Sequence, residues 1–321
     1  MAREYEESLT YLPEELQLPL GRIAPEQQER IQEIRLRSGR PLSVFDGAAS
    51  RFVTREGGLS PRPVPGCLTA DGALLERCFV RLCDYSVHTH QQELGRGFIT
   101  TPRGDRVGVC ASASLGADGG LVFRGVSSLN LRISRDIPGA ARDLAARVDL
   151  LGGVVLAGAP STGKTTMLRD AGRMLASGEL GDCRKVTFID ERYELSAMDG
   201  GVPRKNIGYC ADAVCGIPKK AAIEQAVRTL SPEVIICDEM GSPQEVDEIR
   251  AALACGVGFL VSVHCGSPEE LFCSPMIRML METGAFASLV LLDSPRRPSR
   301  IRQIVGREAY HAEVCGAFVS V

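Results

Sequence analysis

Residues 158–165 have the types and the spacing of a phosphate-binding loop, because they match the pattern G-x-x-x-x-G-K-T. Glycines let such a loop wrap so that successive backbone N–H groups point at phosphate oxygens, and a helix that follows adds its positive end. In this pattern Lys164 reaches the β- and γ-phosphates, and the hydroxyl of Thr165 binds Mg²⁺. The predicted nucleotide-binding residues are Gly158, Ala159, Pro160, Ser161, Thr162, Gly163, Lys164, Thr165 and Thr166.

The segments on either side of the loop have the character that this motif requires. Residues 154–157 are apolar over the length of a strand, and apolar residues recur at helical spacing from Met167 to Leu175. A chance match in a chain with 34 glycines would not be expected to have a strand before it and a helix after it. The flanks therefore favour a strand, a phosphate loop and a helix in that order.

A second apolar segment, residues 234–237, is followed directly by Asp238 and Glu239, which is the Walker B pattern. We expect Asp238 to hold Mg²⁺, directly or through water, and Glu239 to polarise the attacking water as a general base. The chain between Lys164 and Asp238 is long enough to hold an intervening strand, as P-loop proteins with an additional central strand require. The alternative is a buried strand with an exposed acidic end.

A third apolar segment ends in carboxylates as well. Residues 186–189 are followed by Asp190, with Glu191 and Glu194 close behind. Because ligands bind at the carboxyl ends of strands in open α/β sheets, these acids are expected near the γ-phosphate. Asp190 is a predicted metal ligand, and Glu191 and Glu194 are predicted catalytic acids. The residues alone leave open which of these acids, or Glu239, acts as the base.

Three further residues have the chemistry to assist hydrolysis. Residues 261–263 form another apolar segment, and His264 follows it, where a histidine could sense the γ-phosphate or position water. A positive charge on the γ-phosphate accelerates phosphoryl transfer, and Arg132 and Arg135 lie just before the segment that carries the phosphate loop. A core or surface histidine and ordinary surface arginines are the alternatives.

The elements that must position these residues indicate an α/β protein of two domains. Residues 139–321 alternate strands with helices, which implies a mainly parallel sheet. The expected strands are 153–157, 186–190, 234–238, 259–263, 287–292 and 301–305, and the expected helices are 140–148, 219–230 and 243–255. Residues 1–138 are predicted to form an α+β domain that begins with a helical lead-in within residues 1–40, where the helical pattern of 26–33 changes to strand-like alternation at 34–37. A helix is expected over 73–83, strands within 97–135, and an irregular segment at 42–66.

The composition excludes some classes of protein. The net charge is −3, tryptophan is absent and aromatic residues make up 5%, so a nucleic-acid-binding surface is not favoured. No apolar run has the length of a membrane span, and the N-terminal residues lack the apolar core of a signal peptide. Twelve cysteines are present without any C-x-x-C pair, so a zinc site is only weakly indicated.

Taken together, these motifs resemble a known family. The phosphate loop, the acidic segment 189–194, the Walker B strand and His264 occur in the order of the type II and type IV secretion ATPases, which have an Asp box and a His box. Residues 33–42 and 127–135 are similar to the stage III sporulation protein AA family, and the resemblance covers nearly the whole chain. Two departures are Asp238-Glu239 instead of Gly-Glu, and Asp190-Glu191 instead of Glu-Asp.

The resemblance implies an ATPase of the additional-strand P-loop class, with a RecA-like core that uses ATP and Mg²⁺. It also implies a motor that forms a homo-oligomer, a hexameric ring, at the cytoplasmic face of a membrane complex between mother cell and forespore. Its partners would be inner-membrane proteins, with no membrane span of its own. By the same resemblance Asp190, Glu191 and Glu194 match the Asp box, Glu239 the catalytic acid, and His264 the His box, while Arg132 and Arg135 match the arginine-bearing segment.

Two other functions remain open from the residues alone. One is a RecA-like ATPase that acts on nucleic acid, which is favoured by the basic residues Arg296, Arg297, Arg300, Arg302 and Arg307. The other is a scaffold that binds ATP and scarcely hydrolyses it, against which the intact Asp238-Glu239 pair argues.

Overall fold

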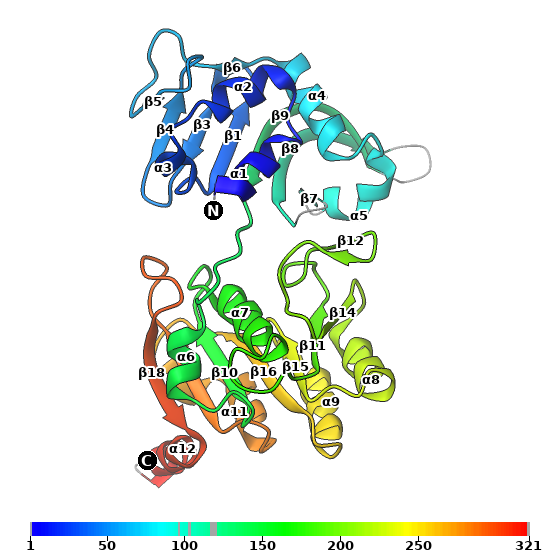
Figure 1. Cartoon of the computed structure of the whole chain (residues 1–321), viewed down its shortest axis with the longest axis vertical. Coiled ribbons are helices and arrows are strands. Elements are labelled where there is room, and N and C mark those ends of the chain that lie inside the picture. The colour runs from blue at the N-terminus through cyan, green and yellow to red at the C-terminus, as the bar shows by residue number, and fades with distance from the viewer. Residues whose placement is uncertain (1, 96, 102–103, 116–120, 320–321) are drawn as a thin grey trace. The chain divides into compact units, whose positions relative to one another are not determined.

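The computed structural model describes residues 2–95, 97–101, 104–115 and 121–319, and the chain divides into two compact units (Figure 1). Unit 1 ends at Arg135 and unit 2 begins at Asp136, three residues before the division expected from the sequence. Each unit contains its own sheet and its own buried apolar core.

Unit 1 is built on a seven-stranded sheet whose paired strands all run antiparallel. In spatial order the strands are β5 (Leu59–Ser60), β4 (Ser50–Val53), β3 (Ser43–Phe45), β1 (Glu33–Arg37), β9 (Leu121–Arg132), β8 (Arg106–Leu115) and β7 (Phe98–Thr100). A two-stranded sheet, β2 (Arg40–Pro41) with β6 (Thr69–Ala70), accompanies it. The helices are α1 (Ala2–Leu9), α2 (Glu14–Gly21), α3 (Pro25–Gln28), α4 (Gly72–Leu82) and α5 (Gln91–Leu94), with a 3₁₀ turn at Val87–His90.

The alternation along β1 determines which face of the unit 1 sheet is covered. Ile34 and Leu36 are buried and pack with residues of α1, α2 and α4, whereas Arg35 and Arg37 are only partly covered on the other face. Figure 1 shows these helices on the same side of the sheet. The period-2 pattern that predicted a strand from residue 34 is therefore explained by one buried face.

Two expectations for unit 1 were wrong, and a third was correct only in outline. The segment 42–66, expected to be irregular, contains β3, β4 and β5, which are too short for periodicity to reveal them. The helix expected over 26–33 ends at Gln28, because the chain turns there into β1. The helical lead-in expected at the N-terminus is confirmed by α1 and α2, but its division into separate helices was not predicted.

Unit 2 has a second seven-stranded sheet, and it is mainly parallel as the sequence predicted. Its spatial order is β14 (Ala211–Cys215), β11 (Val186–Asp190), β15 (Val234–Cys237), β16 (Gly258–His264), β10 (Val154–Gly158), β17 (Ser288–Leu292) and β18 (Ile301–Gly306). Only β18 runs antiparallel to its neighbour in this sheet as described. The six expected strands are confirmed to within one residue at each end, while β14 and the small hairpin of β12 (Met198–Asp199) and β13 (Val202–Pro203) were missed.

The strand that separates the phosphate-loop strand β10 from the Walker B strand β15 is β16. It follows β15 in the chain. The two strands of this sheet that lie between Lys164 and β15 in the chain, β11 and β14, are on the far side of β15 instead. A strand therefore does lie between β10 and β15. It comes from the part of the chain after Asp238, and not from the part between Lys164 and Asp238, where the sequence suggested it.

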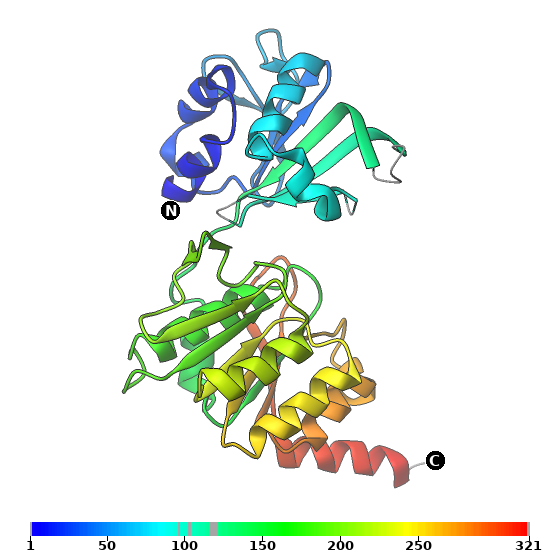
Figure 2. The ribbon, with the colours of Figure 1, turned by 90° about the vertical axis from the view of Figure 1, so that its right-hand side faces the viewer.

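Helices cover both faces of the unit 2 sheet. On one face lie α6 (Arg142–Arg147) and α7 (Lys164–Ala176), and on the other α8 (Lys219–Thr229), α9 (Pro243–Leu253), α10 (Glu270–Cys273), α11 (Pro275–Glu282) and α12 (Arg307–Val319). Figure 2 shows α8 and α9 on the opposite side of the sheet from α7. The side chains of β10 alternate between the two faces. Val154 and Leu156 belong to the apolar core on the side of α6 and α7, and Val155 and Ala157 to the core on the side of α8 and α9, so β10 is apolar throughout.

Within the described ranges, none of the helices combines the length and the apolar character needed to cross a membrane.

Candidate functional site

The loop between β10 and α7 turns tightly and has two residues in the left-handed backbone region. Gly163 has a φ of +91° and Ser161 a φ of +63°, both in the left-handed region. The hydroxyl of Thr162 donates a hydrogen bond to the carbonyl oxygen of Ala159 at 2.8 Å, which closes the loop on itself. The side-chain ammonium of Lys164 donates to the carbonyl oxygens of Gly158 (2.8 Å) and Ala159 (3.0 Å), so it is held at the loop.

Close packing explains why glycine occupies two positions in this loop. A Cβ on Gly158 would lie 2.6 Å from the hydroxyl oxygen of Thr162. A Cβ on Gly163 would lie 2.5 Å from the hydroxyl oxygen and 2.7 Å from the backbone nitrogen of Ser299. Real Cβ contacts are never this short, so any larger residue would displace the loop.

Burial lowers the pKa of Lys164, and Asp238 and Glu239 partly offset that effect.

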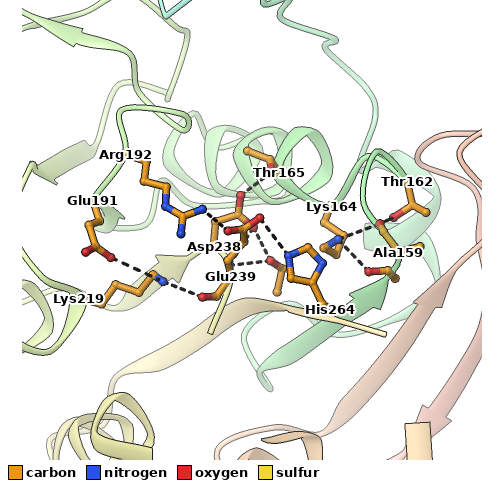
Figure 3. Close-up of polar contacts among 12 residues, drawn as sticks. Ala159, Thr162, Lys164, Thr165, Glu191, Arg192, Lys219, Asp238, Glu239 and His264 are labelled. Carbon is orange, nitrogen blue, oxygen red and sulfur yellow. Dashed lines mark hydrogen bonds and ion pairs between the residues drawn. The ribbon is translucent and has the colours of Figure 1, made fainter. Parts of the chain in front are cut away.

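The first turn of α7 meets the end of β15. The hydroxyl of Thr165 donates a hydrogen bond to one carboxylate oxygen of Asp238, and the hydroxyl of Ser262 on β16 donates to the other (Figure 3). A carboxylate and a hydroxyl side by side are the hard oxygen donors that Mg²⁺ prefers, so the predicted metal ligands Thr165 and Asp238 fit that ion. Among the described residues, no three His, Cys, Asp or Glu side chains gather as a metal-binding cluster, at this position or at any other.

Glu239 adopts a strained backbone conformation, with a φ of +52°. Such a conformation costs about 1–3 kcal/mol in a residue other than glycine and persists only where the surroundings enforce it. Its N–H donates to the hydroxyl of Ser262 at 2.9 Å, and its carbonyl accepts from the ammonium of Lys219 at 2.6 Å. Its carboxylate contacts Nε2 of His264 (3.2 Å) and a guanidinium nitrogen of Arg192 (2.5 Å), as Figure 3 shows. The backbone of Glu239 is therefore held by Ser262 and Lys219, and its carboxylate by His264 and Arg192.

Asp190 organises the turn that follows β11. One carboxylate oxygen accepts from the backbone N–H groups of Glu194 (2.8 Å) and Leu195 (3.1 Å), and the other accepts from the N–H and hydroxyl of Ser196, both at 2.7 Å. All these donors belong to the turn, and Asp190 is only 2% exposed. This role was not anticipated, and the predicted role of Asp190 as a metal ligand stays a prediction.

The acids after β11 and the acids after β15 line one small pocket. Its lining residues are Ile189, Asp190, Glu191, Arg192, Glu194, Leu195, Lys219, Asp238 and Glu239. Lys219 joins the two groups, because its ammonium lies 3.8 Å from the carboxylate of Glu191 and also binds the backbone of Glu239. The structure thus brings Glu191 and Glu194 to the same side of the sheet as Asp238.

Four residues of this region were missed by sequence reasoning, namely Arg192, Lys219, Ser262 and Ser299. Arg192 follows directly on the predicted acids, so its position offered a signal. Lys219 is the first residue of an expected helix and Ser262 lies inside an expected strand, where nothing in the local pattern marks them. Ser299 lies far along the chain in the connection between β17 and β18.

Arg132 and Arg135 are bound within unit 1. The guanidinium of Arg135 donates to the backbone carbonyls of Gln28 and Ile31, both at 2.7 Å, and also to that of Glu29. Burial lowers the pKa of Arg135. Arg132 lies 3.7 Å from the carboxylate of Glu33, its cross-strand neighbour. The predicted catalytic role of these arginines stays a prediction, and for Arg135 it would require the loss of these hydrogen bonds.

The fold of the chain is similar to those of two proteins of solved structure. The ATPase DotB of Legionella pneumophila has a solved structure with a TM-score of 0.53, at 16% identity, over 81% of this chain and 72% of that one. The pilus retraction motor PilT, solved with bound ADP, gives a TM-score of 0.50 at 13% identity over 92% of this chain and 86% of that one. At these identities the likeness concerns the fold alone.

The chain belongs to the family described as "Sporulation stage III, protein AA", whose model matches residues 5–311. It is 30% identical to the stage III sporulation protein AA of Bacillus subtilis (strain 168) over an alignment of 300 residues. That alignment covers 92% of this chain and 94% of that protein. The family resemblance predicted from residues 33–42, 127–135 and the motifs is confirmed.

Proposed function

We propose that unit 2 is a RecA-like P-loop core of the additional-strand class and that the chain hydrolyses ATP with the help of Mg²⁺. The observation that carries this proposal is the contact between Thr165 and Asp238, with Glu239 next in the chain. That contact joins the phosphate loop to the Walker B strand across β16. The order of strands and the likeness to ATPase folds support it.

Each residue of the site has a role in this proposal. The loop 158–165 and Lys164 bind the phosphates, and Thr165 and Asp238 hold Mg²⁺, which would neutralise charge on the β- and γ-phosphates. Glu239 accepts the proton of the attacking water, while His264 and Arg192 orient its carboxylate. A general base of this kind typically contributes a factor of about 10²–10⁴ to the rate.

We further propose that the chain is the motor of a secretion-like complex in sporulation, between mother cell and forespore. It would work as a homo-oligomer, a hexameric ring, on the cytoplasmic side, where inner-membrane proteins of that complex hold it at the membrane. Membership of the sporulation family and the fold shared with a pilus retraction motor support this assignment.

The test is a comparison of ATP binding and ATP turnover in three proteins. The wild-type chain should turn over ATP only with Mg²⁺, and Lys164→Ala should lose most ATP binding. Glu239→Gln should bind ATP with an affinity close to that of the wild type but hydrolyse it about 10²–10⁴ times more slowly. A folded wild-type chain that binds no ATP would refute the proposal, and unchanged turnover in Glu239→Gln would remove Glu239 from the base role.

The oligomer is tested separately by mass measurement with and without a non-hydrolysable ATP analogue. A ring that forms on addition of the nucleotide supports the motor assignment, and a specific activity that rises with protein concentration supports sites shared between subunits. A monomer under all conditions contradicts the ring and leaves the ATPase assignment to the binding and turnover tests.

A further inference from the structure

The connection between β17 and β18, residues 293–300, is fixed against the phosphate loop. The backbone N–H of Ser299 donates to the carbonyl oxygen of Thr162 at 2.8 Å. The connection is itself closed by a bond from the N–H of Asp293 to the carbonyl of Arg300 (2.8 Å) and by a turn in which the N–H of Arg297 donates to the carbonyl of Ser294 (2.9 Å). It is therefore an ordered loop with a fixed attachment point.

The phosphate loop contacts this connection at its Gly163 end, and its Gly158 end lies beside Leu292, the last residue of β17. Ser299 packs against Gly163, and the Cβ of Leu292 lies 3.4 Å from where a Cβ on Gly158 would be. This arrangement follows from the topology, because β17 pairs parallel with β10 and their carboxyl ends lie at one edge of the sheet. Figure 1 shows the connection, in orange, at the same end of the unit 2 sheet as the start of α7.

The connection carries three arginines that the site described above does not use. Arg296, Arg297 and Arg300 are exposed, and within the described part of the chain no ion pair or side-chain hydrogen bond involves any of them. Three cations within five residues, without an acidic partner, repel one another. Such a cluster is more favourable when an anion is near.

The charges inside the site leave a need for additional positive charge. The pocket and Lys164 together have three positive side chains (Lys164, Arg192 and Lys219) and five negative ones (Asp190, Glu191, Glu194, Asp238 and Glu239), which sum to about −2. This set does not neutralise the several negative charges of ATP, and the proposed Mg²⁺ would offset only part of the deficit. The unpaired arginines on the adjoining connection can supply the missing positive potential.

We propose that residues 293–300 form a basic lip of the nucleotide site, on which Arg296, Arg297 and Arg300 attract and bind the triphosphate of ATP in the same chain. This inference rests on the proposed ATP binding and adds to it a set of nucleotide-binding residues outside the phosphate loop. It also gives these arginines, which favoured a nucleic-acid function from the sequence, a role in binding a mononucleotide.

The test measures the dissociation constants of ATP, ADP and AMP at several salt concentrations. The lip variant Arg296→Gln/Arg297→Gln/Arg300→Gln is compared with a control of equal charge change, Arg147→Gln/Arg228→Gln/Arg250→Gln. The control arginines are exposed, and each pairs with an acid one helical turn away. Thermal unfolding midpoints of both variants confirm that the fold is retained.

The lip variant should bind ATP about tenfold more weakly at low salt, which corresponds to a loss of roughly threefold or less for each exposed charge. The loss should be largest for ATP, smaller for ADP and smallest for AMP, and it should shrink towards 1 M salt because screening removes it. The control variant should stay within about twofold of the wild type.

Four outcomes would overturn the inference. An ATP affinity in the lip variant equal to that of the wild type would do so while leaving the proposed ATPase intact. An equal loss in the control variant would show an effect of net charge alone. Loss of single-stranded DNA binding with unchanged ATP binding would assign the arginines to nucleic acid. A folded wild-type chain that binds no ATP would overturn the inference and the proposed function together.

Discussion

Lys219→Met tests whether the strained backbone at Glu239 is enforced from outside the Walker B strand. The ammonium of Lys219 is the donor to the carbonyl of Glu239 at 2.6 Å, and it also lies near the carboxylates of Glu191 (3.8 Å) and Glu245 (3.9 Å). Its side chain is only 10% exposed, and methionine retains much of its length and packing. The substitution therefore removes mainly the charge and the donor.

The expected effect follows from the strength of a hydrogen bond and from the strain. A hydrogen bond from a charged donor contributes about 1.5–3 kcal/mol. The φ of +52° at Glu239 stores about 1–3 kcal/mol of strain, which the backbone would release by relaxing once this hydrogen bond is lost. We expect the free energy of unfolding to fall by about 2 kcal/mol. If this relaxation moves Glu239 and makes its catalytic position less favourable by about 1.4–2.7 kcal/mol, kcat falls by about 10–100-fold.

The assay combines steady-state turnover with equilibrium ATP binding and urea unfolding. ATP affinity should stay within about threefold of the wild type, because Lys219 acts on Glu239 and not on the loop 158–165. Lys220→Met is the matched control, since the adjacent Lys220 is exposed and pairs only with Glu248, at 3.7 Å, among the contacts of the described residues. A folded Lys219→Met protein with wild-type kcat, or one in which affinity falls as much as kcat, would refute the reasoning.

Three further predictions concern the loop and the turn beside it. Gly163→Ala should weaken ATP binding at least about tenfold through the clash with Ser299. The control Gly256→Ala, at a glycine with a similar positive φ and no atom within 4 Å, should lose only stability. Equal ATP affinities of the two variants would contradict the packing argument. Asp190→Asn should lower the free energy of unfolding by about 1–3 kcal/mol, because the NH₂ group that replaces one carboxylate oxygen cannot accept from the turn, and an unchanged urea midpoint would show that the turn does not need the carboxylate. Because burial lowers the pKa of Lys164, ATP affinity should decline as pH rises through a value below 10.5, the usual lysine pKa, and a constant affinity up to that pH would argue against the shift.

The parts of the site that lie on regular elements could be predicted from the sequence. Each strand of unit 2 that leads to a proposed functional residue is buried on both faces, so it reads as a continuous apolar run that ends where the polar residue begins. That pattern by itself predicts that Lys164, Asp238 and Asp190 lie at one edge of one sheet. The identity of the motif then predicts their chemistry.

The parts that depend on long-range contacts could not be predicted in this way. Ser299 contacts the phosphate loop from more than a hundred residues away in the chain, and Lys219 reaches Glu239 from the start of a helix. The same limit applies to β3, which pairs with the edge of β1, and to β4, which pairs with the edge of β3, since neither is marked by alternation in its own sequence. The position of β16 between β10 and β15 is a further case, since spacing along the chain does not give spatial order.

The insertion of β16 explains why the site needs residues from so many elements. With one strand between them, β10 and β15 are about 10 Å apart, which is too far for their own ends to meet. Thr165 crosses that distance from the first turn of α7, and Ser262 bridges it from β16 itself by binding Asp238 and the backbone of Glu239. A change that moves β16 would therefore alter the proposed metal ligand and the proposed base together, although Ser262 contacts neither nucleotide nor water in the proposed mechanism. The polar residue inside that strand is explained by this double contact, since a buried hydroxyl in a sheet core is unfavourable unless it is hydrogen-bonded.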